Sequence, residues 1–334
     1  MKFGVFDHVD DSGLPLAEHL EARLGAAEAY DAFGYHGYHV AEHHGTPLGL
    51  APSSGILLAG LSQRTRRLRF GPLVYLLPLY HPLRLIEEVA MLDALSNGRF
   101  QLGVGRGVSP IELGFYGLDM AEQRGRYDET LAVLLKGLSS DVLNHAGEYY
   151  RFDRVPMTLR PVQRPHPPLW YGVGSPDSIR WCARNGVNAV TRAMGEDVRR
   201  FTELYRAEWT GSEAEMPLLG VNRHIVVAES DAEAKALARP AYARWRRNMA
   251  KLWEERGSGF PLAAQLPERW DEAEAMGHCC AGSPRTVRDI VAREAASGVT
   301  YFVSGFYFGD LPLEAMKRSA ELFAAEVMPA FAPA

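Results

Sequence analysis

Residues 38–49, YHVAEHHGTPLG, are the stretch around which the rest of the chain is organised. The apolar run at residues 38–41 predicts a short buried strand, and Glu42 and His43 follow where that strand ends. The Gly-Thr-Pro that comes next neither continues a strand nor readily begins a helix. Acid–base residues just past the end of a buried strand are typical of a site at the carboxyl edge of a parallel sheet.

Strand-like and helix-like segments alternate on both sides of this stretch. Amphipathic segments with helix start and stop signals separate short apolar runs. The runs predict eight strands, at residues 2–6, 37–41, 68–76, 99–104, 169–173, 187–191, 218–228 and 300–304. Eight strands alternating with helices predict the α/β class and a (β/α)8 TIM barrel, with a doubly wound open sheet as the alternative.

Three segments depart from this alternation. Residues 108–125 are predicted to form a loop, and the proline-rich residues 141–168 an irregular excursion with a small hairpin. Residues 256–282 are predicted to be an irregular insertion, a loop or short helices, before the last βα unit. No linker or internal repeat divides the chain, so we expect residues 1–334 to form a single domain.

The composition excludes several classes of protein. The chain has 334 residues, 47% hydrophobic and 23% charged, with a net charge of −5, which does not favour a broad nucleic-acid surface. Its three cysteines make a disulfide framework unexpected and a reducing cytoplasm the expected location. No run has transmembrane length, and the N-terminus lacks the core of a signal peptide, so we expect no membrane partner.

The residues after the second strand allow three interpretations. Glu42, His43 and His44 are suited to acid–base or hydrogen-bonding chemistry, to metal ligation with His8 and His39 as helpers, or to a structural role. Neighbouring residues on a strand point to opposite sides, and no HExxH or similar spacing is present. We therefore expect no metal.

Two turns have the composition of phosphate-binding segments. Residues 103–107, GVGRG, follow the fourth strand, where glycine would let a ligand approach the backbone and Arg106 would bind phosphate as a fork. Ser175 and Ser178 open the helix after the fifth strand, and a helix N-terminus suits an anion. Arg124 adds a second guanidinium group. Each turn alone is also consistent with a tight turn or a helix cap that binds nothing.

The order of these motifs resembles that of the bacterial luciferase-like, flavin-dependent monooxygenase family. The resemblance runs from MKFGVFDH to EVMPAF and is most specific in AEHHGTPLG, LPLYHPLRLIEEVAMLDALSNGRFQLGVGRG, YGLDMAEQRGRYDETL and GVGSPDSIRWCARNGV. It implies a barrel, usually a homodimer, that uses FMN reduced by a separate flavin reductase. The reduced FMN would react with O2 to give a C4a-(hydro)peroxyflavin, which oxygenates a small, largely apolar organic substrate.

The resemblance also implies roles for individual residues. It assigns flavin oxygen chemistry to His43, with Glu42 beside it. It places Leu73 and Val74 where the family often has a non-prolyl cis peptide beneath the isoalloxazine. It assigns the phosphate of FMN to the remaining positions, which are Arg106, Arg124, Ser175 and Ser178. Gly105 stands where luciferase has a cysteine, so a light-emitting role gains no support.

Two alternative functions stay open at this point. One is an F420-dependent oxidoreductase that transfers hydride on the same fold, and the other is a flavin-binding protein without turnover. The organic substrate is not identified by the sequence. Six aromatic residues are candidates for a largely apolar pocket, although most such residues belong to a core: Tyr75, Tyr80, Phe115, Tyr116, Trp170 and Phe306.

Overall fold

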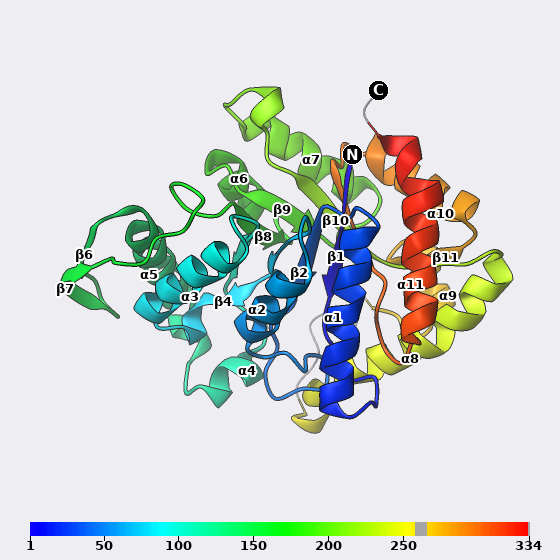
Figure 1. Ribbon diagram of the computed structural model, residues 1–334, viewed down its shortest axis with the longest axis horizontal. Coiled ribbons are helices and arrows are strands. Elements are labelled where there is room, and N and C mark those ends of the chain that lie inside the picture. The colour runs from blue at the N-terminus through cyan, green and yellow to red at the C-terminus, as the bar shows by residue number, and fades with distance from the viewer. Residues whose placement is uncertain (258–265, 333–334) are drawn as a thin grey trace.

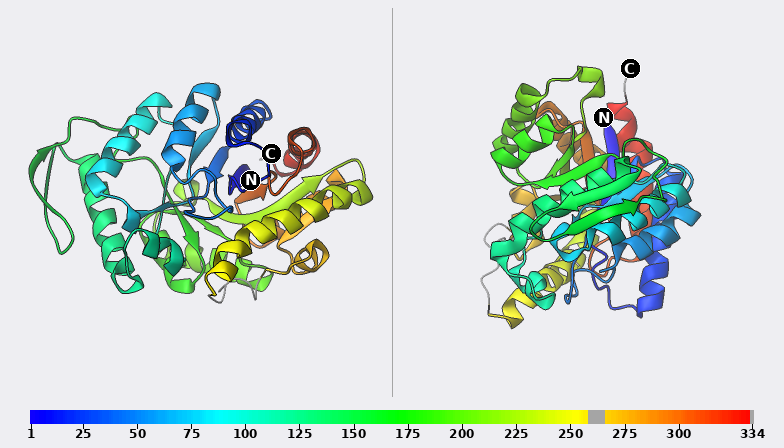
Figure 2. Two further views of the ribbon diagram at one scale, coloured as in Figure 1. Left: turned by 90° about the horizontal axis from the view of Figure 1, so that it is seen from below. Right: turned by 90° about the vertical axis from the view of Figure 1, so that its left-hand side faces the viewer.

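Nine parallel strands follow one another around a nearly closed barrel in the computed structural model, which describes residues 1–257 and 266–332 (Figures 1 and 2). The strands are β1 (Lys2–Asp7), β2 (Gly37–Val40), β3 (Arg69–Pro72), β4 (Tyr75–Leu76), β5 (Leu102–Gly105), β8 (Leu169–Val173), β9 (Asn188–Thr191), β10 (Leu219–Val227) and β12 (Tyr301–Gly305). Their order around the barrel is β3-β2-β1-β12-β10-β9-β8-β5-β4.

β3 and β4 are two parts of the third predicted strand, interrupted at Leu73 and Val74, so the nine strands occupy eight positions. β4 pairs with β5, and a bridge between Phe70 and Phe100 joins β3 to the segment before β5, which brings the two ends of the sheet together. The predicted (β/α)8 barrel is therefore confirmed in preference to the open sheet.

Helices form an outer layer around the strands (Figure 2). The longer helices are α1 (Leu16–Ala32), α2 (Ser54–Arg64), α3 (Pro82–Leu95), α5 (Met120–Ser139), α6 (Pro176–Arg184), α7 (Glu196–Glu208), α8 (Asp231–Glu255), α10 (Pro284–Ala296) and α11 (Leu313–Leu322). Short helical turns occur at Leu77–Leu79, Glu213–Glu215, Phe323–Val327 and Met328–Phe331. No helix within the described ranges is both long and apolar enough to span a membrane.

α3 illustrates how the sequence encodes this layer. Pro82 occupies the first turn, where its missing N–H is not needed, and Gly98 beyond the end has a φ of 78°, which suits glycine. Leu85, Val89 and Leu92 recur at helical spacing and are buried against the barrel. Burying each such side chain contributes roughly 1.5–3 kcal/mol relative to exposing it, so this face fixes α3 on the strands.

The amino end of the barrel is filled by large side chains. Tyr301 lies in space that Gly4 and Gly37 leave open, since a Cβ at either position would overlap its hydroxyl. The Tyr301 hydroxyl is 2.9 Å from His39 Nε2, and the Trp170 ring packs against both side chains. Burial lowers the pKa of His39 to about 3, so this ring is neutral. The packed amino end leaves the carboxyl end of the strands for a site.

The three irregular segments differ from expectation to different degrees. Residues 108–125 contain a helix, α4 (Pro110–Phe115), besides the start of α5, so the loop prediction was wrong there. The predicted hairpin in residues 141–168 is confirmed as β6 (Val142–Ala146) and β7 (Arg151–Pro156), which project from the barrel in Figure 1.

The predicted insertion at residues 256–282 contains a short helix, which was one of the expected alternatives, and a strand that the sequence did not indicate. It holds α9 (Trp270–Ala275) and β11 (Cys279–Gly282), while its residues 258–265 lie outside the described ranges. β11 pairs with the second half of β10, away from the barrel path. A four-residue strand of Cys, Ala and Gly has too little β-branched or aromatic content to be recognised.

Candidate functional site

Two adjoining cavities lie at the carboxyl end of the barrel strands. The large cavity has a volume of about 480 Å³ and the small cavity about 230 Å³. Seven residues line both cavities and form a shared wall: Phe6, His43, Leu73, Val108, Ser109, Glu112 and Gly172. Active sites of such barrels form at this end of the strands, so the two cavities define the candidate site.

The large cavity brings together seven of the eight predicted site residues, which are Glu42, His43, Leu73, Val74, Arg106, Ser175 and Ser178. Arg106 is exposed at one end, with no carboxylate partner among residues 1–257 and 266–332. A Cβ built on Gly172 or Gly174 meets no atom within 4 Å, so these glycines leave the wall open. Such a cavity suits an extended ligand that carries a negative charge at the Arg106 end.

The floor of the large cavity depends on a close approach between two neighbouring strands. The peptide bond between Leu73 and Val74 is cis, at the interruption between β3 and β4. A Cβ on Gly103 would overlap the Pro72 carbonyl, and one on Gly105 would overlap the Val74 side chain. The sequence suggested that these glycines make room for a ligand, but in the structure they make room for the neighbouring strand.

Ser175 and Ser178 form the start of α6. The Ser178 N–H donates to Ser175 Oγ at 3.3 Å, and the Ser175 N–H donates to Ser178 Oγ at 3.1 Å, which is a reciprocal capping box. Both residues also line the large cavity. The start of α6 therefore presents the positive end of its dipole to the cavity that Arg106 also lines.

Arg124 is the predicted site residue that the structure does not bring into the cavity. It lies on α5 with its side chain 68% exposed, and its Nε donates to Asp128 Oδ2 at 2.6 Å. It lines neither the large nor the small cavity. Asp128, an i,i+4 carboxylate on the same helix face, pairs with it instead.

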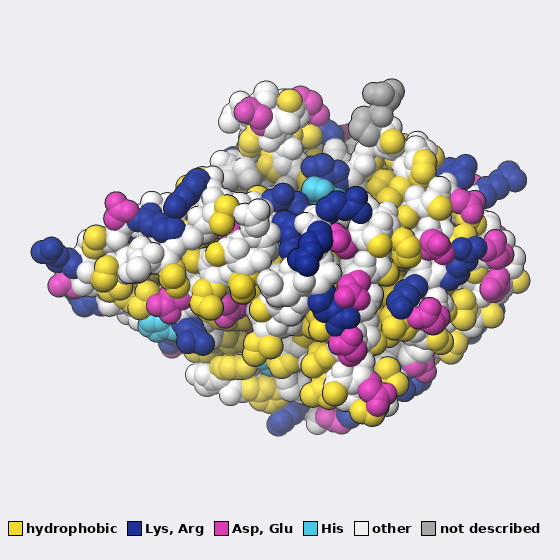
Figure 3. All heavy atoms as spheres, in the orientation of Figure 1, with side chains coloured by type: hydrophobic (Ala, Val, Ile, Leu, Met, Phe, Trp, Pro, Cys, Tyr) yellow, Lys and Arg dark blue, Asp and Glu magenta, His cyan; other side chains and the backbone are white. Residues whose placement is uncertain are grey.

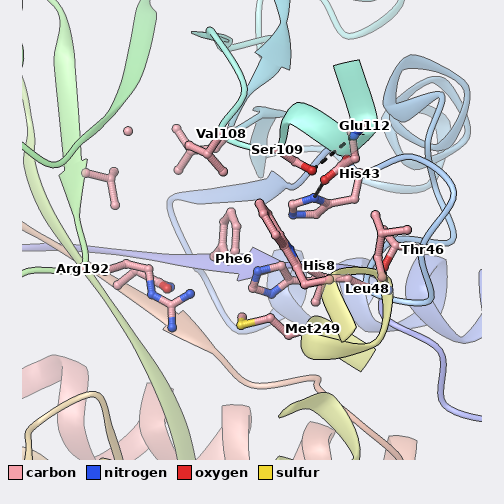
Figure 4. A pocket seen from close by; sticks show the side chains of 16 residues that line it. Phe6, His8, His43, Thr46, Leu48, Val108, Ser109, Glu112, Arg192 and Met249 are labelled. Atoms are coloured by element: carbon pink, nitrogen blue, oxygen red, sulfur yellow. Dashed lines mark hydrogen bonds and ion pairs between the residues drawn. The ribbon is translucent and has the colours of Figure 1, made fainter. Parts of the chain in front are cut away.

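His43 lies in the shared wall and contacts a carboxylate that the sequence reasoning missed. Its Nδ1 is 3.4 Å from Glu112 Oε1 (Figure 4). Glu112 Oε2 accepts the His44 N–H at 2.8 Å. Burial raises the pKa of Glu112, but the hydrogen bonds and charge of His43 and His44 outweigh burial and hold it below the usual 4.5. Because an ionised carboxylate only accepts, the His43 proton is held on Nδ1.

Glu112 could have been found from the helix-capping pattern of its own segment. Ser109 Oγ accepts the Glu112 N–H at 3.2 Å, which makes Ser109 the N-cap of α4 and Glu112 its third residue. A serine followed three residues later by glutamate is a helix-start signal. The short length of α4 concealed it within a segment that otherwise looked like a loop.

Both carboxylate oxygens of Glu42 lie within hydrogen-bond distance of other side chains. The Tyr80 hydroxyl donates to its Oε2 at 2.7 Å, and His44 Nε2 is 3.0 Å from its Oε1. Burial raises the pKa of Glu42, and the bonds from His44 and Tyr80 oppose that effect without cancelling it. Of the two predicted catalytic residues, His43 has its ring on both cavities, whereas Glu42 holds the segment that carries His43.

The small cavity draws on parts of the chain that the sequence did not connect. His8 follows β1, Arg192 follows β9, and Asn222 lies on β10. α8 supplies three further wall residues, Met249, Leu252 and Trp253. None of the six aromatic candidates lines either cavity: Tyr75, Trp170 and Phe306 are in the core, Tyr80 binds Glu42, and Phe115 and Tyr116 are exposed on or beside α4.

The histidines considered as metal helpers are separated from one another. His39 binds Tyr301 inside the barrel, while His8 packs against Trp245. Within residues 1–257 and 266–332, no group of three His, Cys, Asp or Glu side chains is arranged to hold a metal ion.

Comparison with known proteins gives a consistent result. The family model described as luciferase-like monooxygenase matches residues 1–301. The protein y4wF of Sinorhizobium fredii is 40% identical over 98% of this chain and 96% of its own length. The oxygenase component of a flavin-dependent trigonelline monooxygenase from Acinetobacter baylyi is 26% identical over 99% of this chain and 96% of its own length.

Two solved structures share the fold. The monooxygenase RslO1 from Streptomyces bottropensis aligns with a TM-score of 0.88 and 27% identity, covering 99% of this chain and 100% of its own. The oxygenating constituent of 3,6-diketocamphane monooxygenase from Pseudomonas putida, solved in complex with FMN, aligns with a TM-score of 0.83 and 21% identity over 98% of both chains. At that identity the second structure bears on the fold alone.

Proposed function

Because this chain belongs to the luciferase-like monooxygenase family, we propose that it is an FMN-dependent monooxygenase that oxygenates a small, largely apolar organic substrate. The observation that carries the proposal is the shared wall between the two cavities, with His43 in it. A cofactor in the large cavity and a substrate in the small cavity would meet at this wall. The Acinetobacter relative, which is named as flavin-dependent, supports a flavin as the cofactor.

The residues of the large cavity fit FMN. Its volume of about 480 Å³ lies within the usual range of roughly 300–1,000 Å³ for ligand sites. Arg106 and the start of α6 would hold the phosphate, and the open wall at Gly172 and Gly174 leaves room for the ribityl chain. Leu73 and Val74 would support the ring. With O2, bound reduced FMN would supply the oxygenating C4a-(hydro)peroxyflavin that the family resemblance implies.

His43 and Glu112 are proposed as the acid–base pair of the protein. With its proton on Nδ1 facing Glu112, His43 has Nε2 free to accept a proton or a hydrogen bond at the shared wall. Glu112 fixes the orientation of the ring, as the third member of a catalytic triad does. Glu42 is proposed to act indirectly, by holding His44 and the segment around His43.

A homodimer and a separate flavin reductase complete the proposal. The Acinetobacter relative is named as an oxygenase component, which supports a reductase on a separate chain. Ile56 on α2 is 77% exposed, and Met91 and Leu95 on α3 are also exposed, on a face that mixes apolar and charged side chains (Figure 3). We expect these helices to form the dimer contact. Light scattering that gives a monomer mass at micromolar concentration would contradict it.

Titration calorimetry with FMN, riboflavin and F420 tests the cofactor. FMN is expected to bind more tightly than riboflavin, and Arg106→Ala to remove most of that difference, a loss of about 10- to 100-fold in FMN affinity. Arg124→Ala is the matched control, because its exposed guanidinium is paired with Asp128, and it should change FMN affinity by less than about threefold.

Equal affinities for FMN and riboflavin would refute the phosphate site. Tighter binding of F420 than of FMN would replace the proposal with hydride transfer by an F420-dependent oxidoreductase. An equal loss in Arg106→Ala and Arg124→Ala would mean that α5 reorganises when the ligand binds.

A further inference from the structure

Arg192 is a cation without a counter-ion. It directly follows β9 and reaches into the small cavity toward His8 and Met249 (Figure 4). Its guanidinium makes no ion pair and no hydrogen bond with any side chain or backbone group in residues 1–257 and 266–332. The contact it does make is with the Trp245 ring, at 5.7 Å from its centroid. Burial, with a further contribution from the nearby charge of Arg223, lowers the pKa of Arg192 to about 10.

Two other deeply placed arginines show the usual arrangement. Arg23 lies 3.2 Å from Asp7, and Arg223 lies 2.6 Å from Glu294, so each charge is neutralised where it is buried. Removing a charge from water without such a partner costs free energy that the Trp245 ring only partly offsets. A cation kept at this cost, and aimed into a cavity, indicates that a ligand supplies its partner.

The wall around Arg192 is suited to an anion. The Trp245 indole N–H donates to His8 Nδ1 at 3.4 Å, so the proton of the neutral His8 ring is on Nε2. His8 and Asn222 therefore add uncharged donors to the one guanidinium. The acidic residue of the small cavity, Glu112, lies on the opposite side and is engaged by His43 and His44 (Figure 4).

The backbone next to Arg192 is held by two hydrogen bonds. The Ala193 N–H donates to Thr191 Oγ1 at 3.0 Å, and the Arg223 guanidinium donates to the Ala193 carbonyl at 2.7 Å. Hydrogen bonds thus hold both the N–H and the carbonyl of Ala193, the residue that directly follows Arg192. A pre-positioned guanidinium fork matches the two oxygens of a carboxylate.

We propose that the small cavity binds its substrate through a carboxylate that pairs with Arg192, so that the substrate is a small organic acid with an apolar body. The inference rests on the proposed function in one respect, that the small cavity is the substrate site. The remaining wall is mostly apolar, with Leu48, Met249, Leu252 and Trp253. Its volume of about 230 Å³ exceeds the roughly 150 Å³ that accommodates benzene, which suits one ring or a short chain.

The geometry also orients this substrate. Arg192 and the shared wall with His43 lie on opposite sides of the small cavity (Figure 4). With its carboxylate at Arg192, the substrate would present its other end to the shared wall. The position that is oxygenated is therefore remote from the carboxylate.

Matched pairs of acid and amide test the proposal without knowledge of the natural substrate. Benzoate and benzamide, and hexanoate and hexanamide, are titrated into the protein with and without FMN. Each acid is expected to bind about 10- to 100-fold more tightly than its amide. Arg192→Met should abolish that preference, and Arg192→Lys should retain part of it. Arg199→Met is the matched control, because Arg199 is exposed on the following helix, α7, and it should keep the preference.

A second readout separates binding from folding. Because Arg192→Met removes an unpaired charge, the thermal unfolding midpoint without ligand should stay the same or rise. Equal binding of acid and amide, absence of acid binding up to 10 mM, or a preference that survives Arg192→Met would each overturn the proposal. FMN binding measured on the same samples distinguishes this inference from the proposed function. FMN binding without a preference for the acid refutes this inference alone. A preference for the acid without FMN binding refutes the proposed cofactor alone.

Discussion

The two ends of the site each present an arginine that has no carboxylate partner in the described part of the chain, but the arginines differ in their surroundings. Arg106, in the large cavity, is exposed and flanked by glycines, so water solvates its charge whether or not a ligand is present. Arg192, in the small cavity, is half-buried, beside the Trp245 ring and in a wall that is mostly apolar. The difference indicates that the two arginines contribute differently to binding. The exposed charge of Arg106 adds affinity for any phosphate, whereas the less solvated charge of Arg192 disfavours every ligand that does not neutralise it.

The largest effect is expected where the two ends meet. His43→Ala should slow product formation by about 10²–10⁴-fold, because a positioned acid–base group is lost, while FMN affinity changes little. Stopped-flow absorbance after mixing the reduced complex with O2, together with product yield, measures both steps. His44→Ala serves as the neighbouring comparison. Unchanged product yield and kinetics in His43→Ala would return His43 to a structural role.

A smaller effect is expected for Glu112, which acts through His43. Glu112→Gln should lower the rate of product formation by about 10- to 100-fold, the effect of one hydrogen bond to a charged group. In a His43→Ala background the same change should have little further effect, since the carboxylate would have no ring to orient. Additive losses in the double variant would show that Glu112 acts independently. The pH–rate profile of Glu112→Gln should also differ from that of the wild type.

The third test asks whether ligand binding in the small cavity depends on a contact between α8 and the segment after β1. Binding in the large cavity should not depend on this contact. Asn248 on α8 donates to Asp10 Oδ2 at 2.9 Å, and Asp10 also lies 3.8 Å from Arg23. Asn248→Ala should lower the free energy of unfolding by about 1–3 kcal/mol, because it removes a partner from a buried carboxylate. It should weaken benzoate binding and leave FMN affinity within about twofold. Denaturant titration and calorimetry measure these quantities, with the exposed Lys251→Ala on the same helix as control.

The fourth test concerns a dependence of stability on pH that arises around Arg192. Burial and the charge of Arg192 lower the pKa of His224 to about 3. The pKa of His224 in the folded protein lies below its unfolded value of about 6.5. Above pH 6.5 the ring is therefore neutral in both states and costs no stability. As the pH falls from 6.5 toward 3, the unfolded chain binds a proton that the folded protein does not, so the free energy of unfolding declines. The loss is about 1.4 kcal/mol per pH unit for one such histidine. His224→Leu should reduce the slope of unfolding free energy against pH by one proton; an unchanged slope would contradict the assignment.

The same contrast explains how much of the site could be predicted from the sequence. Several residues of the large cavity were predicted because they follow a strand, so local order along the chain determines where they lie, whereas Leu73 and Val74 were predicted from the family resemblance. Arg106 and Ser175 are of this kind, as is His43. The error at Arg124 has the opposite cause, because a helical residue reaches a site or an adjacent carboxylate depending on which face the tertiary fold presents.

The small cavity could not be predicted in this way. Met249 and Trp253 sit near the end of a 25-residue helix, where periodicity indicates a buried face but does not say what that face covers. Arg192 does follow a strand, yet its significance comes from the absence of a counter-ion in three dimensions. The eight barrel positions were predicted because alternation of strands and helices is a property of the whole sequence, whereas β11 and α4 were too short to recognise.

The role of α8 has a consequence for how the protein can change. α8 contributes Met249, Leu252 and Trp253 to the small cavity and contributes nothing to the large one. The floor under the large cavity, by contrast, tolerates no side chain at Gly103 or Gly105. Inherited variation in substrate range can therefore accumulate along one helix while the cofactor site stays under strict selection. A mutant library restricted to positions 249 and 252 would vary the small cavity while every residue that lines the large cavity stays unchanged.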